Sequence, residues 1–224
     1  MSNLGIDVYI DFKSPYAYLA IADIRDLERD FHVRLTWLPY TLDIPDYLGS
    51  AKVDADGKVV EQSRSPHQWR RVRYSYRDVR RYANLRGLTI LGTQKIWDSA
   101  LAGIGLIYAN AQGVTDAYVD IVFERFWRRE LDIEDPAVIA AVLAEAGADA
   151  DGFAAFAAGH GRAEHDRIRE AAETRGVFGV PMVVLEDEMF WGREHISLVR
   201  LRLAERDLAR PGQAPAIDVP YARR

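Results

Sequence analysis

The chain has 224 residues, of which 49% are hydrophobic and 28% charged, with a formal net charge of −5 and a pI of about 5.6. This composition is typical of a globular protein with one large domain or two small ones, and its acidity argues against nucleic acid as a partner. The sequence has no cysteine, which excludes disulfides, a Cys-x-x-Cys redox motif, cysteine-ligated metals and a cysteine nucleophile.

No apolar run reaches the roughly 18 residues that a transmembrane helix needs. Residues 1–11 also lack the basic and apolar regions of a signal peptide. We therefore expect a cytoplasmic protein that does not associate with membranes.

The first 39 residues predict a strand, a helix and a second strand. Residues 5–12 alternate in hydrophobicity and are rich in Ile, Val and Tyr. Ser14 fits the N-cap, and Pro15 the first position, of a helix that extends to about Asp30. Residues 32–38 have the composition of a second strand, which we expect to run parallel to the first because a helix connects them.

The middle of the chain is dominated by helical patterns. Residues 40–65 show little periodicity and contain a predicted turn, DADGKV, and no strand of convincing length is expected between residues 40 and 175. The predicted helices span about 66–86, 95–112, 115–130 and 136–146, with one or two more in residues 150–175.

Strand character returns near the end of the sequence. Residues 180–186, VPMVVLE, and MFW at 189–191 predict a hairpin that Gly192 closes. Glu194 to about Leu208 is predicted to form an amphipathic helix, and the tail from Arg210 contains three prolines and is expected to be irregular.

Three stretches resemble, in order and in separation, motifs of the 2-hydroxychromene-2-carboxylate isomerases and kappa-class glutathione transferases, which are relatives of the DsbA-like oxidoreductases. They are DFKSPYAYLA (11–20), GVFGVP (176–181) and EMFWGRE (188–194), with a weaker match in the basic segment RVRYSYRDVRRYANLRG (71–87). The resemblance covers nearly the whole chain.

This resemblance implies an α/β thioredoxin-like fold with a large all-helical insertion between its βαβ and ββα halves. Residues 1–39 and 176–224 would form the thioredoxin-like domain, and residues 40–175 the inserted helical domain. A homodimer is also expected from the resemblance.

In such proteins glutathione is a bound cofactor or substrate. Its sulfur lies near the serine at the start of the first helix, which is Ser14 here. Its cysteinyl part pairs with the backbone before a cis-proline, which corresponds to Val180 and Pro181. Its γ-glutamyl end is held after the last hairpin, where this chain has Arg193 and Glu194.

Ser14 is the candidate catalytic residue. A free thiol has a pKa near 8.5, and a helix N-terminus with a hydroxyl donor would stabilise its thiolate. The alternative is that Ser14 only caps the helix. Because the chain has no cysteine, any sulfur chemistry needs a thiol that arrives with a ligand.

The last hairpin departs from the kappa-class pattern, which is closer to Gly-Ser-Asp-Arg. This chain has Gly192-Arg193-Glu194-His195, so the acid is kept with one more methylene and a cation directly follows the glycine. Glu194 would accept hydrogen bonds from a γ-glutamyl ammonium, although a carboxylate at a helix start also suits the helix dipole.

Nine side chains that can carry positive charge lie between Arg64 and Arg86. Arginine presents a bidentate fork to carboxylates, and glutathione and an aromatic acid both carry them. We assign Arg64 and Arg71 as candidate substrate-binding residues and Trp97 as a candidate aromatic wall. Lys13 is expected to be exposed, His165 is expected at the surface, and no metal site is expected.

The favoured function is a glutathione-dependent isomerase of 2-hydroxychromene-2-carboxylate-type aromatic acids. Its partners would be glutathione and a small aromatic carboxylate. The alternatives are a kappa-class-like glutathione transferase and a non-catalytic binder of glutathione or a small acid. A thiol–disulfide oxidoreductase is excluded in its usual form because there is no cysteine.

Overall fold

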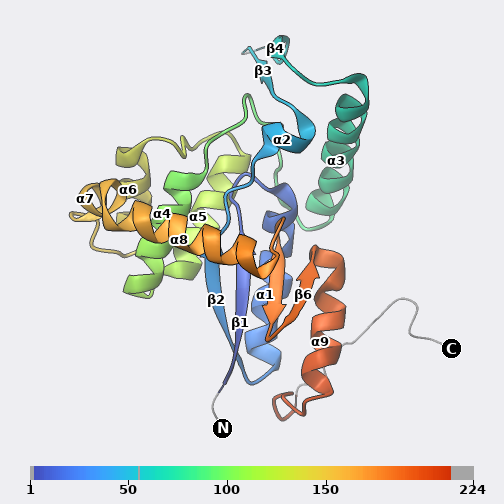
Figure 1. Cartoon of the computed structure of the whole chain (residues 1–224), viewed down its shortest axis with the longest axis vertical. Helices are drawn as coiled ribbons and strands as arrows, with labels where there is room; N and C mark the ends of the chain where they lie inside the picture. The colour runs from blue at the N-terminus through green and yellow to red at the C-terminus, as the bar shows by residue number, and fades with distance from the viewer. Residues whose placement is uncertain (1–2, 55, 213–224) are drawn as a thin grey trace, which may run out of the picture.

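Figure 1 shows the computed structural model of the protein, which describes residues 3–54 and 56–212. The main sheet has four strands in the order β2-β1-β5-β6. Their bounds are Leu4–Ile10 for β1, Val33–Pro39 for β2, Met182–Leu185 for β5 and Glu188–Trp191 for β6. As predicted, β1 and β2 are parallel, whereas β5 is antiparallel to both β1 and β6.

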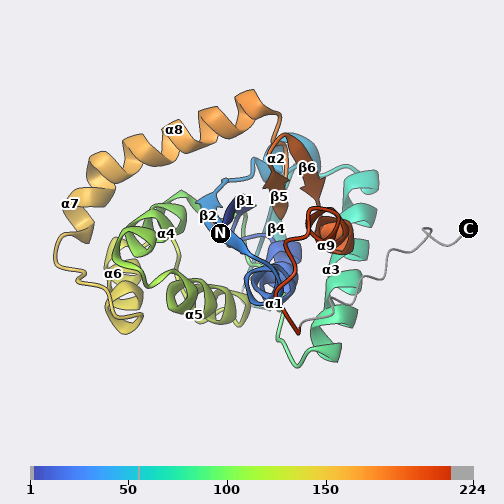
Figure 2. The same cartoon turned by 90° about the horizontal axis from the view of Figure 1, so that it is seen from below.

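The two halves of the sheet each contribute a helix to the same face. Helix α1 (Pro15–Asp30) connects β1 to β2, and α9 (Ile196–Ala204) follows β6 and packs against α1. Seen from below, α1, α9 and α3 (Pro66–Leu85) lie on one side of the sheet and the remaining long helices on the other (Figure 2). This is the predicted βαβ–ββα arrangement.

The segment between β2 and β5 is mostly helical. It contains α2 (Ile44–Leu48), a small hairpin of β3 (Ala51–Val53) and β4 (Val59–Gln62), α3, α4 (Ala100–Gln112), α5 (Thr115–Trp127), α6 (Pro136–Glu145), α7 (Phe153–Ala158) and α8 (His160–Arg175). The ring of Phe12 lies 5.8 Å from that of Tyr118 and 4.8 Å from that of Phe123, so the inserted helices and the sheet share one hydrophobic core.

The structure differs from the predicted elements in three places. The hairpin of β3 and β4 was not expected; the carboxylate of Asp54 accepts the N–H groups of Asp56 and Lys58, which stabilises its turn. The helix predicted from residue 95 begins only at Ala100, after the N-cap residue Ser99, and the Ala100 N–H donates to Oδ1 of Asp98 at 2.9 Å instead of to a preceding helical turn.

The last helix is also shorter than predicted. Residues 193–195 form a 3-10 turn, and α9 ends at Ala204, where the N–H of Leu208 reaches back to the carbonyl of Leu203. The predicted irregular tail lies largely outside the described residues. Within the part of the chain that the structure describes, no helix is both long and apolar enough to span a membrane.

Candidate active site

Four chain segments meet at one end of the sheet. Tyr9 pairs with Met182, so the turn after β1 and the loop before β5 lie at the same end of the sheet. Met182 pairs in turn with Trp191, which brings the residues after β6 to this end as well. The Tyr40 N–H donates to the Ile10 carbonyl at 2.9 Å, so the segment after β2 completes the group. The predicted motifs at Ser14, Val180-Pro181 and Gly192–Glu194 therefore converge.

Ser14 is the N-cap of α1 and is only 5% exposed. Its Oγ accepts the N–H of Ala17 at 3.2 Å, and its own N–H donates to the Asp11 carbonyl at 2.9 Å. The hydroxyl thus acts as an acceptor within the protein, and no acceptor for its proton is found among the described residues. Ser14 can therefore cap the helix and donate a hydrogen bond to a ligand at the same time.

The prediction that Lys13 is exposed was wrong. Its side chain is 7% exposed, and its Nζ lies 3.7 Å from Oδ2 of Asp11, whose side chain is fully buried. Lys13 Nζ also donates to the Trp97 carbonyl at 3.2 Å. Asp11 in turn accepts the N–H groups of Lys13 at 3.0 Å and Leu42 at 2.8 Å. A buried ion pair thus fixes the turn that carries Ser14.

The loop before β5 has backbone groups without a backbone partner at the same end of the sheet. The Val180-Pro181 peptide bond is cis, as predicted. The Pro181 carbonyl accepts the N–H of Gly192 at 2.9 Å, which ties this loop to the end of β6. Among the described residues, the N–H and C=O of Val180 have no backbone partner, so both groups are available to an extended ligand.

After β6, Gly192 adopts φ +91°, a conformation that favours glycine, and turns the chain into the 3-10 segment. The Arg193 guanidinium carbon lies 3.4 Å from the centroid of the Tyr82 ring on α3. Arg193 Nε contacts Oε1 of Glu194 at 3.2 Å without forming a hydrogen bond. The Arg193 side chain is 11% exposed and that of Glu194 is 64% exposed, so Glu194 is the more accessible of the two.

Helix α3 closes one side of this region. The Tyr16 hydroxyl donates to Oδ2 of Asp78 at 3.3 Å, which ties the first turn of α1 to α3. Desolvation, followed by the negative charge of Asp78, raises the pKa of Tyr16 above its usual range, whereas the charge of Arg193 lowers it. The first turn of α1, Arg193 and α3 are therefore electrostatically coupled.

Tyr47 on α2 is a further polar group near this end of the sheet. Desolvation of its hydroxyl is the main cause that raises the pKa of Tyr47 to about 12, and the charges of Asp11 and Asp43 act in the same direction. The positive charge of Arg71, an exposed residue on α3, acts in the opposite direction and lowers this pKa. Tyr47 therefore stays protonated at neutral pH and can donate a hydrogen bond.

The other two candidate substrate residues are placed differently. Arg64 Nε donates to the carbonyls of Leu48 and Gly49, and its guanidinium stacks over Trp69, so it holds α2 against the start of α3. Trp97 is joined to the Ser14 turn through its carbonyl and Lys13 Nζ, while its ring packs edge-on against Phe126 at 5.9 Å.

The expectation that His165 lies at the surface was also wrong. The residue is 2% exposed on α8, and its Nε2 lies 3.0 Å from the hydroxyl of Thr41, just after β2. Burial lowers the pKa of His165, although its contact with Asp166 opposes this effect. The imidazole is thus a buried polar link between α8 and the end of β2.

The profile of the DSBA-like thioredoxin domain family matches residues 5–204 of this chain. The chain belongs to this family. The 2-hydroxychromene-2-carboxylate isomerase of Pseudomonas sp. (strain C18) is 30% identical to this DSBA-like protein over 195 residues, which cover 87% of each chain. The isomerase of Pseudomonas putida is 29% identical over 195 residues, covering 87% of this chain and 91% of the relative.

A solved structure of a 2-hydroxychromene-2-carboxylate isomerase superposes on this DSBA-like protein with a TM-score of 0.70 and 26% identity, covering 91% of this chain and 96% of that one. The predicted family resemblance and fold class are confirmed by these matches. Sequence reasoning missed the Asp11–Lys13 pair, the Tyr16–Asp78 contact and Tyr47. Only the D-x-K-S spacing before α1 offered a signal for the first of these.

Proposed function

We propose that this protein is a glutathione-dependent isomerase of 2-hydroxychromene-2-carboxylate-type aromatic acids. The observation that carries the proposal is a buried serine at the start of α1, in a chain without cysteine, whose hydroxyl proton is available to a ligand. The similarity to named isomerases over 87% of the chain supports the choice of reaction.

The residues at this end of the sheet fit a bound glutathione. Ser14 offers a hydroxyl donor beside the helix N-terminus, Val180 offers an unpaired N–H and C=O, and Glu194 offers an accessible carboxylate. These groups match the thiol, the cysteinyl backbone and the γ-glutamyl ammonium group of the tripeptide. When bound, glutathione would supply a nucleophilic thiolate whose reversible addition to the unsaturated acid permits rotation about the former double bond.

The residues of this chain would bind glutathione and the substrate and would stabilise negative charge on the sulfur. The Ser14 hydroxyl and the N–H groups of the first turn of α1 would stabilise negative charge at the sulfur position. The Asp11–Lys13 pair would hold the turn, and hence the hydroxyl, in place. Tyr47, which remains protonated, and Arg71 would donate hydrogen bonds to carboxylates on the α3 side of the site.

The test combines binding with turnover. Calorimetric titration of the wild-type protein with glutathione should show saturable binding, and isomerisation of 2-hydroxychromene-2-carboxylate should require added glutathione. Mass spectrometry of the products should show the isomer and no glutathione adduct; a stable adduct would instead identify a transferase. Absence of glutathione binding, or isomerisation at the same rate without glutathione, would overturn the proposal.

A further inference from the structure

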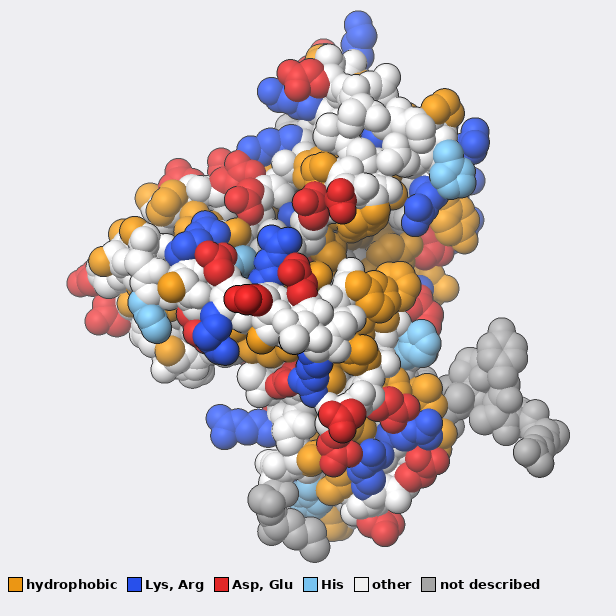
Figure 3. Space-filling model, in the orientation of Figure 1, with side chains coloured by type: hydrophobic (Ala, Val, Ile, Leu, Met, Phe, Trp, Pro, Cys, Tyr) orange, Lys and Arg blue, Asp and Glu red, His pale blue; other side chains and the backbone are white. Residues whose placement is uncertain are grey.

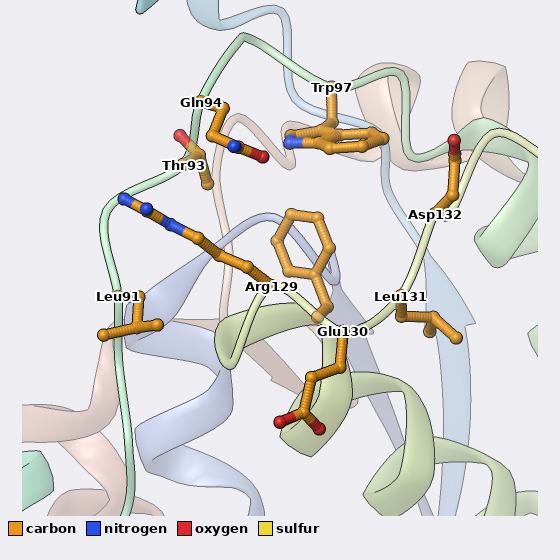
Figure 4. Close-up of a pocket in the computed structure, with 9 residues that line it drawn as sticks. Leu91, Thr93, Gln94, Trp97, Arg129, Glu130, Leu131 and Asp132 are labelled. Carbon is orange, nitrogen blue, oxygen red and sulfur yellow. The ribbon is translucent and has the colours of Figure 1, made fainter. Parts of the chain in front are cut away.

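A cavity of about 310 Å³ lies between residues 91–97 and residues 126–132 (Figure 4). Its lining contains neither the Asp11–Ser14 turn nor Val180-Pro181 nor any residue of α3. Its volume is at the lower end of the range of about 300–1,000 Å³ typical of small-molecule sites. Of the site residues predicted from the sequence the cavity contains only Trp97, so it is distinct from the group around Ser14, Val180 and Glu194, and it is large enough for a small ligand.

Two aromatic rings form one wall of this cavity. The rings of Trp97 and Phe126 meet edge-on, with centroids 5.9 Å apart and an interplanar angle of 80°. Lys95 Nζ lies 4.3 Å from the centroid of the Trp97 ring, and the same ammonium pairs with Glu134 at 2.5 Å. These contacts fix the indole, so that it offers a preformed surface to a planar ring.

Two guanidinium groups come together at Gly92, and one of them, that of Arg129, lines the cavity. Arg129 Nε donates to the Gly92 carbonyl at 2.6 Å, and Arg80 Nε donates to the Ile90 carbonyl at 3.0 Å. A Cβ on Gly92 would lie 3.6 Å from Nη2 of Arg80 and 3.8 Å from Nη2 of Arg129. Among the described residues, no carboxylate lies within ion-pair distance of either guanidinium. Two cations held together without an acid favour an anion there.

The acids that line the cavity do not neutralise this pair. Glu130 points away from the Trp97 ring, and Asp132 lies at the opposite end of the cavity from the Arg129 guanidinium (Figure 4). Asp132 also accepts the N–H of Glu134 at 2.9 Å through Oδ1. The cavity thus has a cationic end at Arg129 and an aromatic wall beside it.

We propose that this cavity is a second ligand site, which binds a small planar aromatic carboxylate. The ring would lie against Trp97 and Phe126, and the carboxylate would accept hydrogen bonds from the free Nη groups of Arg129, with Arg80 adding positive charge. Because the Trp97 carbonyl is bonded to Lys13, the site is connected to the turn that carries Ser14. The proposal does not depend on the isomerase activity.

The test is calorimetric titration of the full chain with 2-naphthoate. Wild type should show saturable binding, and Arg129→Gln should weaken that binding by about tenfold or more, as expected for the loss of a charged hydrogen-bonding partner. Arg128→Gln is the matched control, because Arg128 pairs with Glu124 at 2.7 Å and does not line the cavity. Circular dichroism should show that both variants are folded. Arg80→Gln should also weaken the binding of 2-naphthoate, independently of Arg129→Gln.

A further arm separates this site from the glutathione site. Binding of 2-naphthoate should be unchanged in Ser14→Ala and in the presence of saturating glutathione. No saturable binding by wild type at millimolar 2-naphthoate would overturn the proposal. Equal binding by wild type and Arg129→Gln, or competition with glutathione, would overturn it as well.

Discussion

Replacement of Ser14 by Ala tests whether the N-cap hydroxyl of α1 also acts on a ligand thiol. A hydrogen bond to a charged acceptor contributes about 1.5–3 kcal/mol, and about 1.4 kcal/mol corresponds to one pKa unit. The pKa of the thiol of bound glutathione should therefore be higher by about 1 to 2 in Ser14→Ala than in wild type. The ultraviolet absorbance of the thiolate, followed against pH in the protein–glutathione complex, measures this difference directly.

The same substitution removes a helix cap, so its effect on folding needs a control. The Ser14 hydroxyl accepts the Ala17 N–H, and loss of such a cap costs about 1 kcal/mol. Ser65 caps α3 in the same way, accepting the Gln68 N–H at 3.2 Å. Ser65→Ala should lose similar stability and leave the thiol pKa unchanged. An unchanged thiol pKa in Ser14→Ala, with glutathione still bound, would refute the role of the hydroxyl and leave Ser14 as a cap only.

Three further predictions concern the surroundings of the site. Asp11→Asn should lower the free energy of unfolding in urea by about 3–5 kcal/mol, because it leaves the buried ammonium of Lys13 without its partner; a loss below about 1 kcal/mol would contradict the ion pair. The free energy of unfolding of wild type should fall as the pH drops below about 6.5, because His165 takes up a proton in the unfolded state but not in the folded state, where burial lowers its pKa. In His165→Gln this fall should be smaller; the same slope of unfolding free energy against pH in both proteins, measured by urea unfolding, would disprove this. Gly105→Ala should lower the melting temperature sharply, because the new Cβ would lie 2.1 Å from the Tyr118 hydroxyl; an unchanged melting temperature would show that the helices can separate there.

Matched variants keep these predictions specific. His160 is exposed on the same helix as His165, so His160→Gln is the matched control for replacing a histidine of α8. A Cβ on Gly5 would meet no atom within 4 Å, so Gly5→Ala should be nearly neutral by comparison with Gly105→Ala.

The sequence could predict those parts of the fold that depend on local patterns. The alternation in residues 5–12 and the Ser14-Pro15 start of α1 are local signals, and both are found in the structure. The burial of Lys13 was not predictable in this way, because its carbonyl partner at Trp97 lies 84 residues further along the chain. His165 is similar, since its burial depends on how α8 packs beside the end of β2. Periodicity describes one element at a time, whereas these side chains are placed by contacts between elements.

The exposure of hydrophobic side chains near the last hairpin was likewise not predictable from the sequence pattern. Phe178, Met189 and Trp191 are 62%, 40% and 52% exposed, and hydrophobic side chains are visible on this face close to β6 (Figure 3). The pattern of β6 predicts a strand, but not that its outward residues stay uncovered at the edge of the sheet.

The position of the helical insertion also determines when β1 can pair with β5 during synthesis. Asp7 in β1 pairs with Val184 in β5, so the two halves of the candidate site are made before and after the helical insertion. The βαβ unit leaves the ribosome before the insertion, and one edge of β1 then has no neighbouring strand until β5 has been made. An open edge of this kind is a template for pairing with other chains. The time needed to make and fold the helical insertion therefore sets how long this edge of β1 stays unpaired.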